Sequence, residues 1–366
     1  MSIAYEYALR QTRQTRQTRM QFLLKYLHKE WNDIMSITVV LQQMIMIFIL
    51  IGVGMILYKK EMLSEPTSKQ ISGIIVNVTN PALLICSAFG DGPRASLWEL
   101  GTALAVFLVV YAILIALSFL IPHILRVPNK YHYCYQMLTI FGNVGFIGIP
   151  LASAVLGTES LIFVSIYKVI FNILFYTFGI SILQRAAVRQ STTISENGSN
   201  VQGTQNSHAA IPDKHISAFR WKKLINAGTI SATASIILYL AKLPVPDIVP
   251  STLNYMGHAT TLLSMLVLGT SVAQMALKDI FAHPKLYGFV LLRQILVPVG
   301  CVVLFRLFIS DTLILNTLAL MLAVPAGNLP LMLSKQLHVE ADTISQGIIL
   351  STLLSLVTIP VVSLII

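Results

Sequence analysis

The chain has 366 residues, of which 55% are hydrophobic and 11% are charged, and its formal net charge is +10. So few charged residues could not cover the surface of a soluble domain of this length, so the composition excludes an ordinary globular protein. Apolar runs of roughly 20 residues recur along the chain, which is the length that crosses a hydrocarbon core of about 30 Å. The sequence therefore predicts an all-α polytopic membrane protein.

The first 36 residues differ from the rest of the chain. Residues 1–34 hold six Lys or Arg residues and include the run "RQTRQTRQTR". No apolar stretch follows these charges directly, so the segment is neither a membrane span nor a signal peptide. We expect residues 1–36 to form a weakly structured N-terminal extension.

Ten membrane spans are predicted in two groups of five. A polar segment rich in Ser, Asn, Gln and Thr separates the groups, and this composition is typical of a flexible loop. The expected regions are a first five-helix repeat at 37–184, the loop at 185–221 and a second five-helix repeat at 222–366. The spans are 37–58, 68–89, 98–121, 133–156, 159–184, 222–242, 250–275, 285–308, 312–334 and 342–366.

The basic residues of the loops predict the orientation. Ten Lys or Arg residues lie in the loops on one side and three in the loops on the other. Because cytoplasmic loops carry the excess of positive charge, the first side, with the loop 185–221, is expected in the cytoplasm. Both ends of the ten-span unit, including the C-terminus, would then lie outside a plasma membrane. The same distribution of charge over loops argues against nucleic acid as a partner.

Two apolar segments contain residues that break helices. The stretch "FGNVGFIGIPL" at 141–151 is matched in the ninth span by "AVPAGNLPLMLSK" at 323–335. The pairs Gly142-Asn143 and Gly327-Asn328 are 185 residues apart, and this offset also brings the starts of the other four pairs of spans into register. Since each half has an odd number of spans, the second half must enter the membrane from the opposite side. The pattern predicts a 5+5 inverted repeat with broken, crossing fourth and ninth helices.

A substrate site is predicted where the two breaks meet. Unpaired backbone groups are tolerated at membrane depth only where they line a protein-enclosed cavity, and the N-termini of half-helices there carry partial positive charge. A pair of kinked, closely packed helices is the structural alternative. The candidate substrate-binding residues are Gly142, Asn143, Gly145, Pro325, Gly327 and Asn328.

Three further polar residues are secondary candidates. Asn80 precedes a proline in the second span, close to Asn77, and either amide can cap a local break or face a cavity. Lys168 and Arg293 lie within apolar runs, where a charge is expensive. Each can pair with an anionic substrate, bind backbone carbonyls or extend toward the membrane interface. His258 is a candidate proton acceptor, although a packing role is the simpler interpretation.

The broken segments also resemble a known family. "GNVGFIGIPL" and "VPAGNLPLMLSKQLHV" are similar to the fourth- and ninth-helix signatures of the auxin efflux carrier family, which includes plant PIN-type auxin carriers and bacterial malate or malonate carriers. Further similarity lies in "VTNPALLICSAF", "LLRQILVP" and "SQGIILSTLLSLVTIPVV". The resemblance implies ten helices, a scaffold made of the first, second, sixth and seventh helices, a mobile transport domain and often a homodimer. The short central loop departs from the long-loop plant members.

These features favour a secondary carrier of small organic anions in the lipid bilayer, such as carboxylates of the malate, malonate or auxin-like kind. A bile-acid-type symporter on a similar inverted-repeat fold is the alternative. A membrane-embedded enzyme is disfavoured because the spans contain no nucleophile, carboxylate pair or metal cluster in a catalytic pattern. No Asp or Glu lies near the centre of a span, and the chain has no nucleotide-binding motif, so we expect no cofactor and no direct use of ATP.

Overall fold

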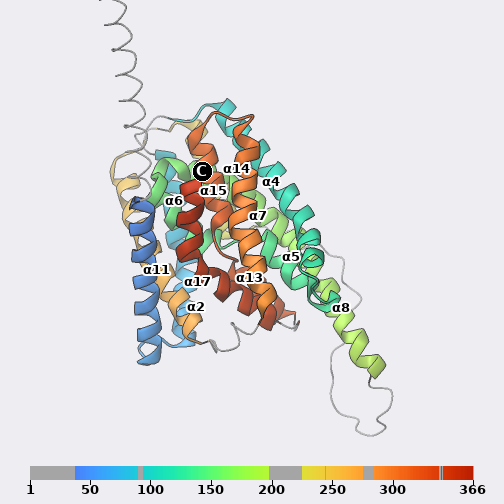
Figure 1. The fold of residues 1–366 in the computed structure, drawn as a ribbon. Helices are drawn as coiled ribbons and strands as arrows, with labels where there is room; N and C mark the ends of the chain where they lie inside the picture. The colour runs from blue at the N-terminus through green and yellow to red at the C-terminus, as the bar shows by residue number, and fades with distance from the viewer. Residues whose placement is uncertain are drawn as a thin grey trace, which may run out of the picture.

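The computed structural model describes residues 38–89, 94–197, 225–243, 245–274, 283–337, 339 and 341–365. Within these ranges the chain is helical, with short connections and one isolated antiparallel bridge, between Gly142 and Ala326. The expectation of a weakly structured extension at 1–36 falls outside the described residues. Figure 1 shows the helices gathered into one bundle, from which α8 projects at one end.

The helices follow one another with short breaks and local changes of pitch. In the first half they are Thr38–Lys59, α2 (Glu65–Ile74), η1 (Ile75–Thr79), α3 (Asn80–Cys86), η2 (Ser87–Phe89), α4 (Leu97–Ile124), η3 (Asn129–Tyr131), α5 (His132–Ile140), η4 (Val144–Gly148), α6 (Ile149–Leu156), η5 (Thr158–Ser160), α7 (Leu161–Leu174), η6 (Phe175–Gly179) and α8 (Ile180–Asn197). In the second half they are α10 (Ala227–Ala241), α11 (Ile248–Ala273), α13 (Pro284–Leu291), η7 (Leu292–Leu296), α14 (Val297–Arg306), α15 (Thr312–Ala323), α16 (Asn328–Gln336) and α17 (Asp342–Ile365).

Seven helices in the described chain are long and apolar enough to cross a membrane. Three more apolar helices, Val144–Leu156, Ala227–Ala241 and Thr312–Ala323, are shorter than a full span. Two of these are the broken segments, which are short because each lies on one side of a break. A polytopic membrane protein is confirmed, whereas the ten-span inverted repeat stays a prediction.

Several helices begin at residues that satisfy their first backbone N–H groups. Ser96 and Glu99 form a reciprocal capping box at the start of α4. The Asp311 carboxylate accepts hydrogen bonds from the N–H groups of Leu313 and Ile314 at the start of α15. These caps lie just before long apolar runs, so they fix where the chain enters each helix.

The loop predicted at 185–221 begins later than expected. Residues 185–197 continue α8, and the rest of that loop, from residue 198, lies outside the described residues. Ile182 and Ala186 on α8 are buried, and the Gln190 side chain donates a hydrogen bond of 3.1 Å to the Tyr133 hydroxyl of α5. Tertiary contacts with α5 therefore extend the helix past the point where its apolar composition ends.

The helices pack in two groups that meet around the broken segments. In one group, α11 lies against the helix Thr38–Lys59 and against α2 and α3, while α10 packs on α3. In the other group, α4 packs on α5 and α7, and α17 packs on α5, α13 and α15. The groups meet where α10 packs on α7 and where η4 packs on α11. At the first break, α5 packs on α4 and α17, whereas η4 packs on α11; at the second, α15 and α16 both pack on α17.

Glycines allow the helix Thr38–Lys59 to approach α11 closely. A Cβ atom at Gly269 would lie 2.2 Å from the Ile51 carbonyl oxygen, and one at Gly54 would lie 2.5 Å from the Leu266 carbonyl oxygen. These are backbone atoms, which cannot rotate away as a side chain can. Small residues bring membrane helices together in this way because van der Waals packing drives their association.

We expect Gly269→Ala to separate these two helices and to lower the free energy of unfolding by about 1–3 kcal/mol, the usual effect of overpacking. Gly52→Ala is the matched control, because a Cβ atom at Gly52 meets nothing within 4 Å. Thermal unfolding of the detergent-purified protein measures both variants. Equal melting temperatures for the two variants would contradict the close approach.

Candidate functional site

The two broken helices cross where their backbones are extended. The chain leaves helical geometry between α5 and η4, and again between α15 and α16. The Asn143 N–H donates to the Pro325 carbonyl over 2.7 Å, and the Gly327 N–H donates to the Phe141 carbonyl over 2.9 Å. Each break therefore supplies hydrogen-bond partners for the other, as a low-dielectric surrounding requires.

Glycine is needed at this crossing because the two backbones touch. A Cβ atom at Gly327 would lie 2.8 Å from the Gly142 carbonyl oxygen, and one at Gly142 would lie 3.0 Å from a Val324 methyl carbon. Pro325 has no N–H group to leave unsatisfied, and its carbonyl is used by Asn143. The residues that mark the breaks in the sequence therefore match the geometry of the crossing.

Arg293 lies behind the crossing and binds both helices that end there. Its Nε donates a hydrogen bond of 2.6 Å to the Thr139 carbonyl, and its Nη1 donates to the Leu322 carbonyl. Thr139 and Leu322 stand in the last turns of α5 and α15, where carbonyl groups lack intrahelical partners and carry partial negative charge. The guanidinium therefore stabilises two helix C-termini at once.

A second set of hydrogen bonds supports the same crossing from α17. The Ala326 N–H donates to the Ser351 hydroxyl over 3.1 Å, and the Ser351 carbonyl accepts a bond of 3.0 Å from the Gln294 side chain. Gln294 follows Arg293 in η7, so one π-helical turn carries two adjacent side chains that hold the crossing.

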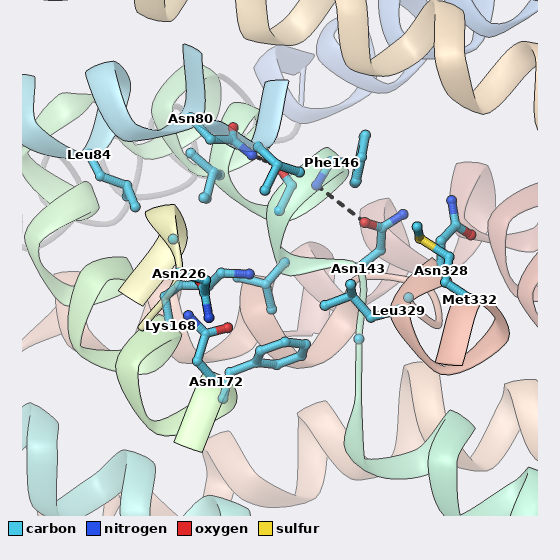
Figure 2. Close-up of a pocket in the computed structure, with 18 of the residues that line it drawn as sticks. Asn80, Leu84, Asn143, Phe146, Lys168, Asn172, Asn226, Asn328, Leu329 and Met332 are labelled. Carbon is cyan, nitrogen blue, oxygen red and sulfur yellow. Dashed lines mark hydrogen bonds between the residues drawn. The ribbon is translucent and has the colours of Figure 1, made fainter. Parts of the chain in front are cut away.

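In front of the crossing lies a cavity of about 90 Å³. Seven of the nine candidate residues line it: Asn80, Gly142, Asn143, Gly145, Lys168, Gly327 and Asn328. Pro325 and Arg293 are not among its lining residues. In the view of Figure 2, Asn143 and Asn328 stand on one side of the cavity, and Lys168, Asn172 and Asn226 stand on the other.

Two asparagines at the cavity keep polar atoms without partners. The Asn143 Oδ1 accepts a hydrogen bond of 3.2 Å from the Phe146 N–H, while its buried Nδ2 has no partner. The Asn80 Nδ2 donates to the Gly145 carbonyl over 3.0 Å, while its buried Oδ1 has no partner. A buried unpaired amide is costly, so these atoms are available to a polar ligand.

Lys168 brings a positive charge to the cavity wall. Its side chain is 9% exposed, and its ammonium group lies 4.6 Å from the centre of the Phe171 ring. Across the described ranges, this ammonium group forms no ion pair and no hydrogen bond. A Cβ atom at Gly145 would come within 3.7 Å of it, so glycine keeps the approach to the charge open.

Three residues of this wall were not predicted from the sequence: Asn172, Asn226 and Gly228. Asn172 stands four residues after Lys168 on α7, a spacing that places both side chains on one helix face and that could have identified it. The Asn172 Nδ2 donates to the Thr229 hydroxyl over 3.0 Å. Asn226 and Gly228 begin α10, and only the packing of α10 on α7 brings them to the cavity.

The other polar candidates lie elsewhere. The Asn77 side chain is exposed and donates to the Gly73 carbonyl of its own helix. The His258 side chain is also exposed on α11. Neither residue is among those that line the cavity.

A comparison of the sequence with protein families shows the family of the chain. The sequence model of the family described as "Membrane transport protein" matches residues 39–363, which is most of the chain. The chain belongs to this auxin efflux carrier-type family. No match was found among curated proteins.

As a member of a membrane transport family, the protein is a membrane transporter, and its family is one of transporters rather than of enzymes. The lining residues of the crossover cavity include one Lys, five Asn and no acidic residue. The helical segments η4 and α16 also begin at the cavity, and their N-terminal ends contribute partial positive charge. The electrostatics of the described cavity wall therefore favour an anion.

We expect Arg293→Gln to lower the stability of the transporter strongly, because it removes charge-assisted hydrogen bonds to two helix ends. Each such bond contributes about 1.5–3 kcal/mol. Arg293→Lys should be intermediate, since an ammonium group keeps the charge but lacks the planar fork. Arg306→Gln, at the end of α14, is the control, and thermal unfolding in detergent is the measurement. A melting temperature for Arg293→Gln equal to that of the control would refute the role.

Proposed function

We propose that this transporter carries small organic anions, specifically carboxylates, by alternating access at the crossover cavity. The observation that carries the proposal is the Lys168 ammonium group, which lies at the cavity wall without a counter-ion among the described residues. A buried charge without a partner is expensive, and a substrate carboxylate would remove that cost. The transport family of the chain supports the same general activity.

Within this proposal, the carboxylate binds Lys168 and the rest of the substrate contacts the amides of Asn143 and Asn328. The free Nδ2 of Asn143 supplies a donor, and the free Oδ1 of Asn80 supplies an acceptor for a hydroxyl or a protonated group. The cavity volume is only about 90 Å³. Short aliphatic acids such as malonate or malate therefore fit this conformation better than a bulky aromatic acid.

The proposal includes the inverted repeat that the sequence predicts. Two observations support it: the 185-residue offset between the two halves, and the hydrogen bonds that join the Gly142 and Gly327 segments. The helix Thr38–Lys59, α2 with α3, α10 and α11 correspond to the first, second, sixth and seventh predicted spans, and they pack on one another. We assign them to the scaffold and the crossover helices to the moving part.

The proposed location is the plasma membrane, with the polar segment at 185–221 in the cytoplasm and the C-terminus outside. The distribution of loop Lys and Arg residues supports this orientation. A homodimer stays a prediction from the family resemblance. Small carboxylates carry negative charge at neutral pH, so a potential negative inside would favour their export.

The charge of Lys168 determines which step of the transport cycle depends on the membrane potential. A monocarboxylate bound to the ammonium group forms a neutral pair, so the loaded carrier would cross with little net charge, whereas a dicarboxylate would leave one negative charge. The empty carrier would then return with its positive charge, and the complete cycle moves the whole charge of the substrate outward. A potential of 100 mV is worth about 2.3 kcal/mol per charge over that cycle.

We expect Lys168→Met to weaken carboxylate binding by about tenfold to a hundredfold, because a hydrogen bond to a charged group contributes about 1.5–3 kcal/mol. Lys60→Met, which removes an exposed lysine, should bind normally. A screen of mono- and dicarboxylates by ligand-induced thermal shift supplies the ligand for calorimetric titration of both variants.

In the same titrations, Asn143→Asp should abolish binding although the protein stays folded. The aspartate keeps an oxygen to accept the Phe146 N–H but replaces the free donor with a negative charge. Asn77→Asp, on the exposed side of the second span, is the matched control. Normal binding by Lys168→Met and Asn143→Asp would exclude this cavity as the anion site.

We also expect transport in proteoliposomes to respond to an imposed membrane potential without a proton or sodium gradient. Reversing the sign of a potassium-diffusion potential should reverse the preferred direction of carboxylate flux. Empty liposomes and liposomes with Lys168→Met protein are the controls. Flux that ignored the potential but required a proton or sodium gradient would overturn the proposed mechanism.

A further inference from the structure

A second cavity, of about 610 Å³, lies at one end of the bundle, between the end of α4, the start of α5 and the length of α8. It shares no lining residue with the crossover cavity. The proposed transport mechanism gives it no role.

The cavity has a basic part and an apolar part. Lys130, Arg185 and Arg189 bring positive charge, and the lining residues include no Asp or Glu. Phe119 and Phe178 form the apolar part, with their rings in edge-to-face contact at a centroid distance of 6.5 Å. The cavity is therefore amphipathic. A site for a purely ionic ligand would not need the apolar part.

The order of residues along η6 and α8 orients the two parts relative to the membrane. Phe178, Ile182, Arg185 and Arg189 follow at helical spacing and form one face that changes from apolar to basic. The apolar span that contains this face ends at Gln190. We therefore expect the apolar part of the cavity to face acyl chains and the basic part, nearer the end of the span, to face lipid headgroups.

We propose that this cavity binds an anionic phospholipid, with its phosphate against Arg185, Arg189 and Lys130 and its glycerol and acyl region against Phe119 and Phe178. Guanidinium groups match the geometry of phosphate oxygens, and each basic residue at an anionic membrane surface contributes about 1 kcal/mol, or roughly fivefold in affinity. The loops at this end carry the excess of basic residues, so the lipid belongs to the leaflet that we expect to be cytoplasmic.

Lipid at this position would join three elements that lead to the crossover. α8 is already tied to α5 by the hydrogen bond between Gln190 and Tyr133. α5 runs directly into the first break, and α4 packs along α5. A bound phospholipid would therefore hold the helix that carries half of the crossover without touching the anion-binding cavity.

Native mass spectrometry of the full-length protein in detergent tests the proposal. Short-chain phosphatidylglycerol and phosphatidylcholine with identical acyl chains are titrated as probes, so that only the headgroup charge differs. We expect phosphatidylglycerol to bind at least tenfold more tightly than phosphatidylcholine. Equal affinity for the two lipids would overturn the proposal.

Matched variants locate the site. Arg185→Gln with Arg189→Gln should weaken phosphatidylglycerol binding by at least tenfold, whereas Lys59→Gln with Lys60→Gln removes the same charge outside the cavity and should leave it unchanged. Equal binding by both double variants would refute this cavity as the site. If the arginine variant does not fold, both arginines are replaced by lysine, which keeps the charge. An affinity of this variant for phosphatidylglycerol that lies between the wild-type affinities for phosphatidylglycerol and phosphatidylcholine supports the assignment. An unchanged affinity for phosphatidylglycerol contradicts it.

Inorganic phosphate distinguishes a lipid from a free anion. Because phosphate lacks the part that contacts the two phenylalanines, millimolar inorganic phosphate should not displace phosphatidylglycerol. Displacement at equal concentration would show a free-phosphate site and exclude the lipid. Carboxylate binding at the crossover cavity should be unaffected in these variants, so a failure here is separate from a failure of the transport proposal.

Discussion

The mutual hydrogen bonding of two broken helices is the constraint on which the rest of the structure depends. Each break frees backbone groups in a region where water is not available, and an unpaired group there costs several kcal/mol. The pairing of Asn143 with Pro325 and of Gly327 with Phe141 removes that cost for both segments. Neither break alone would satisfy its own backbone groups, so each break requires the other.

Close pairing in turn determines which residues stand at and behind the crossing. The backbones approach closely enough that a Cβ atom at Gly327 would lie 2.8 Å from the Gly142 carbonyl oxygen, so glycine is required. The helices that stop there expose carbonyl ends, and Arg293 binds one from each. The helices that start there face the cavity with the opposite partial charge. The same geometry thus separates a cation-binding side from an anion-favouring side.

The sequence predicted the breaks because glycine, proline and asparagine are conspicuous in an apolar run, and the 185-residue offset paired them. It did not predict that Arg293 lies behind the crossing, because pairing with a substrate, binding backbone carbonyls and reaching the membrane interface all give the same local pattern. Asn226 and Gly228 were missed because they reach the cavity only through the packing of α10 on α7. The end of α8 was misjudged for a similar reason, as contacts with α5 override a polar composition.

The two buried cations differ in how the protein compensates their charge. Arg293 is 3% exposed, and its Nε and Nη1 donate hydrogen bonds to carbonyl groups at two helix ends. The fold itself therefore compensates its charge. Lys168 is 9% exposed, and among the described residues its ammonium group forms no ion pair or hydrogen bond and lies 4.6 Å from the centre of the Phe171 ring. A cation–π contact contributes about 0.5–2 kcal/mol, well below the cost of burying an ammonium group. Part of the cost of burying the Lys168 ammonium group therefore stays uncompensated. In the proposed mechanism, an anionic substrate would compensate it, and this gain would contribute to the affinity of the site.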